Sequence, residues 1–171
     1  MEPMSKTVTN DAAEFSFYKF RAKPSKLQII LSLYIGFVFV QSLFYKFSDA
    51  PETQYIFGTL ETWASGFGYS GLFAHGGIFS AKVIGSFELI SSTLLALSLL
   101  TQRVVLRVAG SLAALGIISG AIFFHLFTPL GIVVQDDGGL LFTMACGVWI
   151  SSVVMLFLDR RYVFRVLGLT L

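Results

Sequence analysis

The sequence predicts an all-α polytopic membrane protein, a bundle of four transmembrane helices, and three observations predict it. Hydrophobic residues make up 55% of the 171 residues and charged residues only 13%, about half the charged share of an ordinary soluble domain. The mean hydropathy is +0.77. Charged residues also divide the chain into four long runs, each able to cross a bilayer as a helix of about 20 residues. Backbone groups in lipid must pair within their own segment, which favours helices over open strands.

Four spans are predicted in chain order, at residues 27–47, 78–101, 104–127 and 139–158. A cleaved signal peptide is the alternative for the first span. Its uncharged run is longer than a signal core of about 7–15 residues, however, and a polar stretch precedes it. The membrane domain is therefore predicted over residues 26–160, between a polar, basic segment at 1–25 and a short tail at 161–171.

The basic residues predict the orientation of the spans. Ten of the twelve Lys and Arg residues lie before the first span, around the turn between the second and third spans (Arg103 and Arg107), or from residue 160 onward. Cytoplasmic loops carry such an excess of positive charge. Both termini are therefore predicted in the cytoplasm, and the first and third loops outside it.

The first loop, at about residues 48–77, is too long for a simple turn and is predicted to contain a short amphipathic helix. Asp49-Ala-Pro-Glu52 has the spacing of a capping box, and proline is tolerated in a first helical turn. Apolar residues then recur at helical spacing: Ile56, Phe57, Leu60 and Trp63. We expect this helix at the outer interface, its apolar face in the headgroup boundary or on the bundle.

Glu88 is the acidic residue inside a predicted span, near the bilayer midplane if that helix begins at Ile78. On insertion scales an acidic residue at that depth costs roughly 2.5–3.5 kcal/mol, so such a residue rarely faces lipid. Gly85 and other small or polar residues share its helical face, which predicts packing against another helix. Glu88 is either a proton-linked or ligand-contacting carboxylate, or a structural hydrogen-bonding group between helices.

The third span offers two further candidate features. His125, near its outer end, could carry a proton or donate to a quinone oxygen or a headgroup; the alternative is a histidine satisfied by a loop carbonyl. On the opposite face, Gly116 and Gly120 have the GxxxG spacing that lets another helix approach closely.

Four more charged residues are predicted at the outer surface: Lys46, Lys82, Asp136 and Asp137. With His125 they could surround an outer-leaflet pocket that deepens toward Glu88. Lysine snorkelling and helix capping would account for the same residues one by one.

Composition excludes several classes of function. A single cysteine, Cys146, allows no intrachain disulfide or CxxC redox pair. Two histidines argue against a His-rich metal or haem site, and no dinucleotide or P-loop motif is present. A net charge of +2 gives no sign of nucleic-acid binding. We expect no covalent or metal cofactor, so redox chemistry would need a lipid-soluble carrier such as a quinone, or a partner protein.

Several motifs, in order, resemble the DoxX-like (DoxX/DoxD) family of membrane proteins. They are Phe44-Tyr-Lys-Phe47, Gly85-Ser-Phe-Glu-Leu-Ile90, the run at 119–132, and Asp136-Asp-Gly-Gly-Leu-Leu-Phe142. The resemblance implies a four-helix protein of the bacterial inner (plasma) membrane, with motif positions Lys46, Glu88, His125 and Asp137. Some members of the family are membrane subunits of thiosulfate:quinone oxidoreductases.

Three functions follow as hypotheses. The first is a small membrane subunit that binds quinone or a similar amphipathic ligand for a redox partner, using Glu88 and His125, with Lys46 and Lys82 attracting an anionic substrate. The second is a non-catalytic scaffold that docks a membrane-protein partner through its GxxxG face and loop helix. The third is a small-solute or proton-coupled transporter, which with four spans would need at least a homodimer.

Overall fold

The computed structural model describes residues 21–166, with side chains up to residue 163. The segments 1–20 and 167–171, and the predictions made for them, lie outside the described residues. The helices are α1 (Lys26–Phe47), α2 (Pro51–Ser65), α3 (Ala81–Thr101), α4 (Val104–Phe127), α5 (Leu140–Leu158) and α6 (Arg160–Val166). Of these, α1, α3, α4 and α5 are long and apolar enough to cross a membrane. The predicted four-helix membrane bundle is confirmed, each span within three residues.

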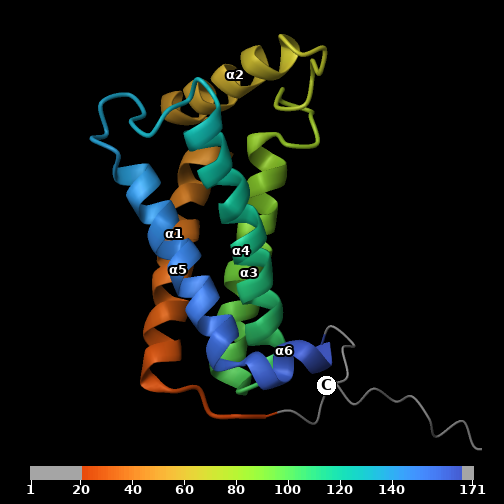
Figure 1. The fold of residues 1–171 in the computed structure, drawn as a ribbon, viewed down its shortest axis with the longest axis vertical. Coiled ribbons are helices and arrows are strands. Elements are labelled where there is room, and N and C mark those ends of the chain that lie inside the picture. Colours follow the sequence, from red (N-terminus) through yellow and green to blue (C-terminus); the bar gives the residue numbers. More distant parts are fainter. Residues whose placement is uncertain (1–20, 167–171) are drawn as a thin grey trace, which may run out of the picture.

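The four long helices run side by side, with α2 across one end of the bundle and α6 at the other (Figure 1). We call these the α2 end and the α6 end. Helix α1 packs on α3 and α5, and α4 packs on the same two helices, so the four surround a common core. The fully buried core side chains come from all four helices: Ile35, Phe39, Leu95, Ala114, Val148 and Met155.

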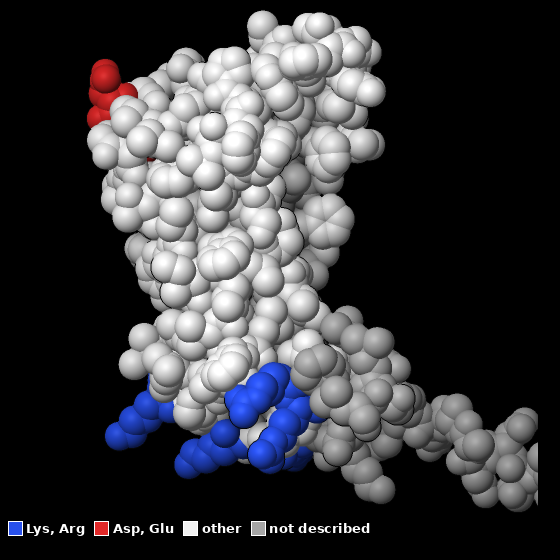
Figure 2. Space-filling model, in the orientation of Figure 1, with Lys and Arg blue, Asp and Glu red and all other residues white. Residues whose placement is uncertain are grey.

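The outer surface of the bundle is apolar where lipid would cover it. Ile30, Phe37 and Leu100 expose more than half of their side-chain surface. Figure 2 shows a broad face without charged side chains between a blue cluster at the α6 end and a small red one at the α2 end. Since large exposed apolar surfaces are rare in soluble monomers, this distribution indicates a bilayer environment.

The start of α1 is fixed by a local hydrogen-bonding motif. Ser25 Oγ accepts from the Gln28 backbone N–H at 3.2 Å, and Gln28 Oε1 accepts from the Ser25 N–H at 2.9 Å. This reciprocal pair is a capping box, which satisfies two donors that a helix start leaves without partners.

Helix α2 confirms the predicted loop helix but not its predicted cap. The residue before the helix is Ala50, which makes no side-chain cap, whereas Asp49 has φ +54° and is turned out of the capping position. Pro51 occupies the first helical position, where its missing N–H costs nothing. The apolar face packs on the loops between spans, in a cluster of Leu60, Ala64, Phe73, Leu130 and Val134. The apolar face of α2 was predicted to lie either in the headgroup boundary or on the bundle, and the structure places it on the protein.

The glycines that bring helices together differ from the predicted pair. A Cβ at Gly116 or Gly120 would meet no neighbouring atom within 4 Å, so none of the helices described in residues 21–166 approaches closely there. A Cβ at Gly110 would lie 2.9 Å from Leu95 Cγ, and one at Gly147 would overlap the Tyr34 ring. Close packing of α4 on α3 and of α5 on α1 therefore depends on Gly110 and Gly147.

Candidate functional site

A buried ion pair joins α1 and α3 near the α2 end. Lys46 Nζ lies 2.8 Å and 2.9 Å from the two carboxylate oxygens of Glu88, and it also donates to Ser42 Oγ one turn earlier on α1. The exposed fractions of the Lys46 and Glu88 side chains are 15% and 6%. A charge removed from water must be paired to be tolerated, so each of these groups stabilises the other.

Gly85, one turn before Glu88, allows α1 to lie close enough for this pairing. A Cβ at this position would already touch Leu43, Phe47 and Lys46 at 3.4–3.5 Å. The packing role predicted for Gly85 therefore has a specific consequence, because a bulkier side chain would push the end of α1 away from α3.

Glu88 lies nearer to the end of its helix than the sequence predicts. Helix α3 begins at Ala81, not at Ile78, so Glu88 is its eighth residue. At 1.5 Å per residue it lies about 10 Å from the start of the helix. This position brings the carboxylate within reach of Lys46 in the last turn of α1.

A pocket of about 250 Å³ lies between α2 and the adjoining ends of α1 and α3. Lys46 lines it, whereas Glu88 is not among the lining residues. Aromatic rings supply the apolar part of the wall and charged or amide side chains the rest. The lining side chains come from α1, α2, α3 and the segments that join them, and include Lys46, Asp49, Thr53, Gln54, Phe57, Glu61, Phe73, His75 and Lys82.

The charges that line the pocket are balanced. Lys46 and Lys82 contribute two positive charges, Asp49 and Glu61 two negative ones, and His75 is exposed. Glu88, behind the lining, adds a third carboxylate that pairs with Lys46. The pocket therefore has no excess of positive charge, which fits a neutral, amphipathic ligand better than the anionic substrate expected from the two lysines alone.

Glu61 ties α2 to the loop that follows it. Its carboxylate oxygens accept from the backbone N–H groups of Gly71 at 2.5 Å and Phe73 at 2.9 Å. These hydrogen bonds, that of Gly71 most strongly, lower the pKa of Glu61 below its usual value. The loop that forms part of the pocket wall is thus held by an ionised carboxylate.

Acidification should loosen this loop. A carboxyl group whose pKa is lower in the folded state stabilises that state above the unfolded pKa, near 4.5, and the contribution is lost as the pH falls through the folded value. We expect hydrogen exchange at residues 71–73, corrected for intrinsic rate, to speed up at acidic pH in the wild type. Glu61→Gln should exchange fast already at pH 7, whereas Glu52→Gln, at an exposed acid on α2, should match the wild type. Equal protection in Glu61→Gln and wild type at both pH values would contradict this role.

His125 and Asp137 organise the α4–α5 loop and do not line the pocket. His125 Nδ1 lies 2.6 Å from the Gly131 carbonyl oxygen, and its ring packs edge-on against Phe142. This contact corresponds to the structural alternative of a histidine satisfied by a loop carbonyl.

The Asp137 carboxylate accepts from three backbone N–H groups, those of Val134, Gly139 and Leu141, at 2.8–2.9 Å. Burial raises the pKa of Asp137, but these hydrogen bonds and the charge of His125 outweigh it, so the pKa lies below its usual value. Asp136 is exposed, with φ +63°. The six predicted candidates therefore divide into two groups. Lys46 and Lys82 line the pocket and Glu88 pairs with Lys46 beside it, whereas His125, Asp136 and Asp137 lie in or next to the α4–α5 loop.

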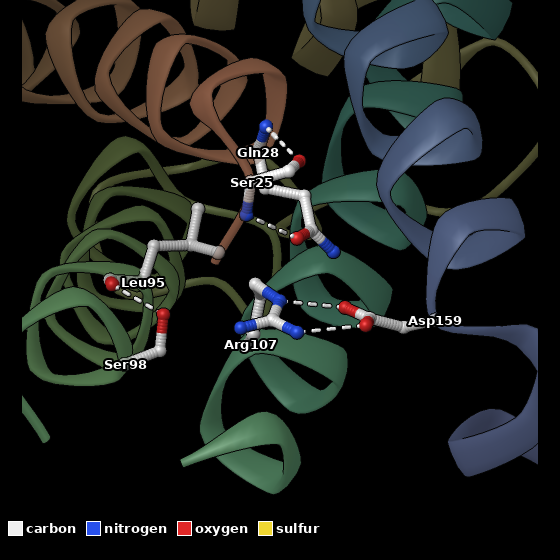
Figure 3. A network of polar contacts seen from close by, with 6 residues as sticks. All are labelled: Ser25, Gln28, Leu95, Ser98, Arg107 and Asp159. Atoms are coloured by element: carbon white, nitrogen blue, oxygen red, sulfur yellow. Dashed lines mark hydrogen bonds and ion pairs between the residues drawn. The ribbon is translucent and has the colours of Figure 1, made fainter. Parts of the chain in front are cut away.

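A second buried ion pair, which the charge pattern did not predict, lies at the α6 end (Figure 3). Arg107 Nε and Nη2 donate to the two carboxylate oxygens of Asp159 at 2.6 Å and 2.7 Å. The exposed fractions of the two side chains are 2% and 5%. This bidentate contact fixes the start of α4 to the end of α5. Helix α6 (Arg160–Val166) follows directly after Asp159, so residues 161–166 of the predicted tail are helical.

Among residues 21–166, no group of three or more His, Cys, Asp or Glu side chains is placed to hold a metal ion. Comparisons with protein-family models, curated proteins and solved structures give no match to this chain.

Proposed function

We propose that the protein is a DoxX-like membrane subunit that binds a quinone, or a similar amphipathic ligand, in the pocket beneath α2 and presents it to a redox partner. In this proposal the protein resides in the bacterial inner membrane. Its termini and α6 end face the cytoplasm, as the distribution of basic residues favours, and α2 lies on the outer side.

The Lys46–Glu88 pair is the observation that carries this proposal. Ligand pockets combine an apolar wall with a few well-placed polar groups, and here Phe57 and Phe73 stand with the Lys46 ammonium in one lining. An ammonium has three N–H donors, and those of Lys46 are directed to Ser42 Oγ and to both Glu88 oxygens. In this proposal a ligand carbonyl replaces one of the two Glu88 oxygens as acceptor, and the other oxygen keeps Lys46 in place. A volume of about 250 Å³ suits a headgroup, while an isoprenoid or alkyl tail would remain in lipid.

Each charged residue has a separate task in this proposal. Lys46 donates to the ligand oxygen, and Glu88 holds the ammonium in position. Glu61 keeps the loop wall closed through the Gly71 and Phe73 amides. A bound quinone supplies the capacity to accept or release electrons and protons, and the redox partner supplies the electrons.

A scaffold protein is the second candidate, and one observation favours it. The Gly116 and Gly120 face of α4 is open to a neighbour, since no other part of the described residues comes within 4 Å of a Cβ built there. A transmembrane helix of a partner could approach closely at such a face.

The two candidates predict opposite results in one experiment. The protein is purified in mild detergent, and an organic extract is analysed by mass spectrometry for quinone per mole of protein. For the ligand-binding function we expect near-stoichiometric quinone, lost in Lys46→Met and Glu88→Gln and retained in His125→Ala and Gly116→Leu. No enrichment over bulk lipid in the wild type would overturn it. Loss of a co-purifying membrane protein in Gly116→Leu alone would support the scaffold.

A further inference from the structure

The lipid-facing side of α1 carries a polar side chain within an otherwise apolar surface. Gln41 is exposed and lies six residues before Phe47, the last residue of α1, which is about 9 Å inside the end of the helix. Within residues 21–166, no group donates to the Gln41 amide or accepts from it. An amide without hydrogen-bond partners is costly in hydrocarbon, so a neighbouring molecule that supplies partners would stabilise it.

Other exposed polar side chains of the spanning helices already have partners. Ser86 and Thr93 on α3 each donate to a backbone carbonyl oxygen one turn earlier, at 2.8 Å. Ser119 on α4 accepts from the Trp149 indole N–H at 3.1 Å. Gln41 differs from them because its amide offers two donors and an acceptor, and its own helix takes up none of them.

The residues around Gln41 have the spacing of paired helices. Ile30, Phe37 and Phe44 recur every seven residues along α1, with exposed fractions of 62%, 64% and 73%. Gln41 lies four residues after Phe37 and three before Phe44, so it shares their face. We call these four residues the α1 stripe. Alternating steps of three and four residues are the repeat through which two helices pack side by side, and a polar side chain within that repeat sets their register.

The charges on α1 do not keep two copies of the stripe apart. Residues 27–45 contain no Lys, Arg, Asp or Glu. Lys46 lies five residues after Gln41, about 140° around the helix, and is directed to Glu88 inside the bundle.

The Gln41 amide is complementary to a second copy of itself. The distribution of basic residues selects one orientation in the membrane, so two copies insert in the same direction with their α1 helices parallel. A two-fold axis between them brings each residue of the α1 stripe opposite its own copy. Because an amide has both donors and an acceptor, the two Gln41 side chains can then bond to each other. An unrelated helix would need a polar group of its own at the same depth.

We propose that the protein is a parallel homodimer in the membrane, in which the α1 stripes of two copies pack together and the two Gln41 amides hydrogen-bond across the two-fold axis. Hydrogen bonds between such side chains stabilise the association of helices in membranes. Lys46, which lines the pocket beneath α2, lies on the other side of α1, so the dimer does not depend on the proposed ligand site.

The first test measures dimerisation of the full chain in lipid vesicles, by energy transfer between donor-labelled and acceptor-labelled copies over a range of protein-to-lipid ratios. We expect a dimer whose dissociation constant rises roughly tenfold in Gln41→Leu, the size expected for a pair of interhelical hydrogen bonds in a membrane. Gln41→Asn keeps the amide and should retain most of the affinity. Thr93→Val, the matched control at an exposed hydroxyl that bonds within its own helix, should dimerise like the wild type.

Cysteine crosslinking in the same vesicles locates the interface. In a Cys146→Ser background, Phe37→Cys and Phe44→Cys should form disulfide-linked dimers on mild oxidation. Phe123→Cys, at an exposed position on α4 seven residues after Gly116, should not. These phenylalanine side chains are exposed, so their replacement leaves the packed core intact.

Three results would overturn the dimer. One is a wild-type chain that stays monomeric at every protein-to-lipid ratio, and another is an unchanged dissociation constant in Gln41→Leu. The third is crosslinking through Phe123→Cys but not through Phe37→Cys or Phe44→Cys, which would place the contact between copies on α4.

Discussion

Asp159→Asn should destabilise the bundle by about 3–5 kcal/mol, because it leaves the Arg107 guanidinium buried without a counter-charge. Arg107 is 2% exposed and both of its contacts to Asp159 are shorter than 2.8 Å, so neither water nor another acid at this end can replace the carboxylate. The measurement is the unfolding free energy of the purified protein in mixed micelles titrated with a denaturing detergent.

A double variant separates the cost of an unpaired charge from a general loss of packing. Arg107→Met/Asp159→Leu removes both charges and keeps apolar volume, and replacements of this kind are often neutral or stabilising. We expect it to recover most of the stability lost in Asp159→Asn. A double variant as unstable as the single one would show that the pair does not act as a unit.

The Lys46–Glu88 ion pair should respond asymmetrically to the loss of its two members. Lys46→Met leaves the Glu88 carboxyl group, whose side chain is 6% exposed, without its ion-pair partner. We expect the unfolding free energy to fall by about 3 kcal/mol. Glu88→Gln should cost less, because the longer lysine side chain can extend its ammonium toward water. The same detergent titration measures both losses.

Lys82→Met is the matched control for this prediction. Lys82 is exposed, and the ion-pair partner of Glu88 among the described residues is Lys46. The unfolding free energy of Lys82→Met should therefore stay within about 0.5 kcal/mol of the wild type, as for most surface substitutions. Equal losses in Lys46→Met and Lys82→Met would mean that the buried pair contributes nothing beyond surface charge.

The parts of the fold that depend on local sequence could be predicted. A span needs length and an absence of charge, and α2 needs apolar residues at helical spacing, so both follow from neighbouring positions along the chain. The predicted cap at Asp49 failed because the backbone there takes a positive φ. That conformation is set by the turn out of α1, where the Ala50 N–H donates to the Tyr45 carbonyl oxygen.

The pairing of charges depends on how the helices are rotated and aligned, which the charge pattern does not reveal. Lys46 and Glu88 are 42 positions apart, and their contact follows from close packing at Gly85. Charge counting assigns Arg107 to a loop, yet one helical turn on lies Ser111, which is buried with Ala114 and Ile118. That shared face was the available signal that Arg107 turns inward and needs a partner.

The division of the predicted site into two groups has the same origin. His125 and Asp137 lie at the same end as Lys46 and Glu88. The α4–α5 loop folds back on them, however, so that the Gly131 carbonyl contacts the His125 ring and backbone N–H groups between residues 134 and 141 donate to the Asp137 carboxylate. The end of the bundle at which a residue lies can be inferred from the sequence. The side of the bundle on which a loop closes cannot.

Quinone binding beside Lys46 is tested most directly by fluorescence quenching from Trp63, which lies on α2. In a Trp149→Phe background, Trp63 is the remaining tryptophan, and a short-chain quinone is titrated into the detergent-purified protein. We predict saturable quenching that Lys46→Met weakens at least tenfold and Lys23→Gln, at the α6 end, leaves unchanged. Quenching that rises linearly without saturation, and equally in all three proteins, would contradict a quinone site in this pocket.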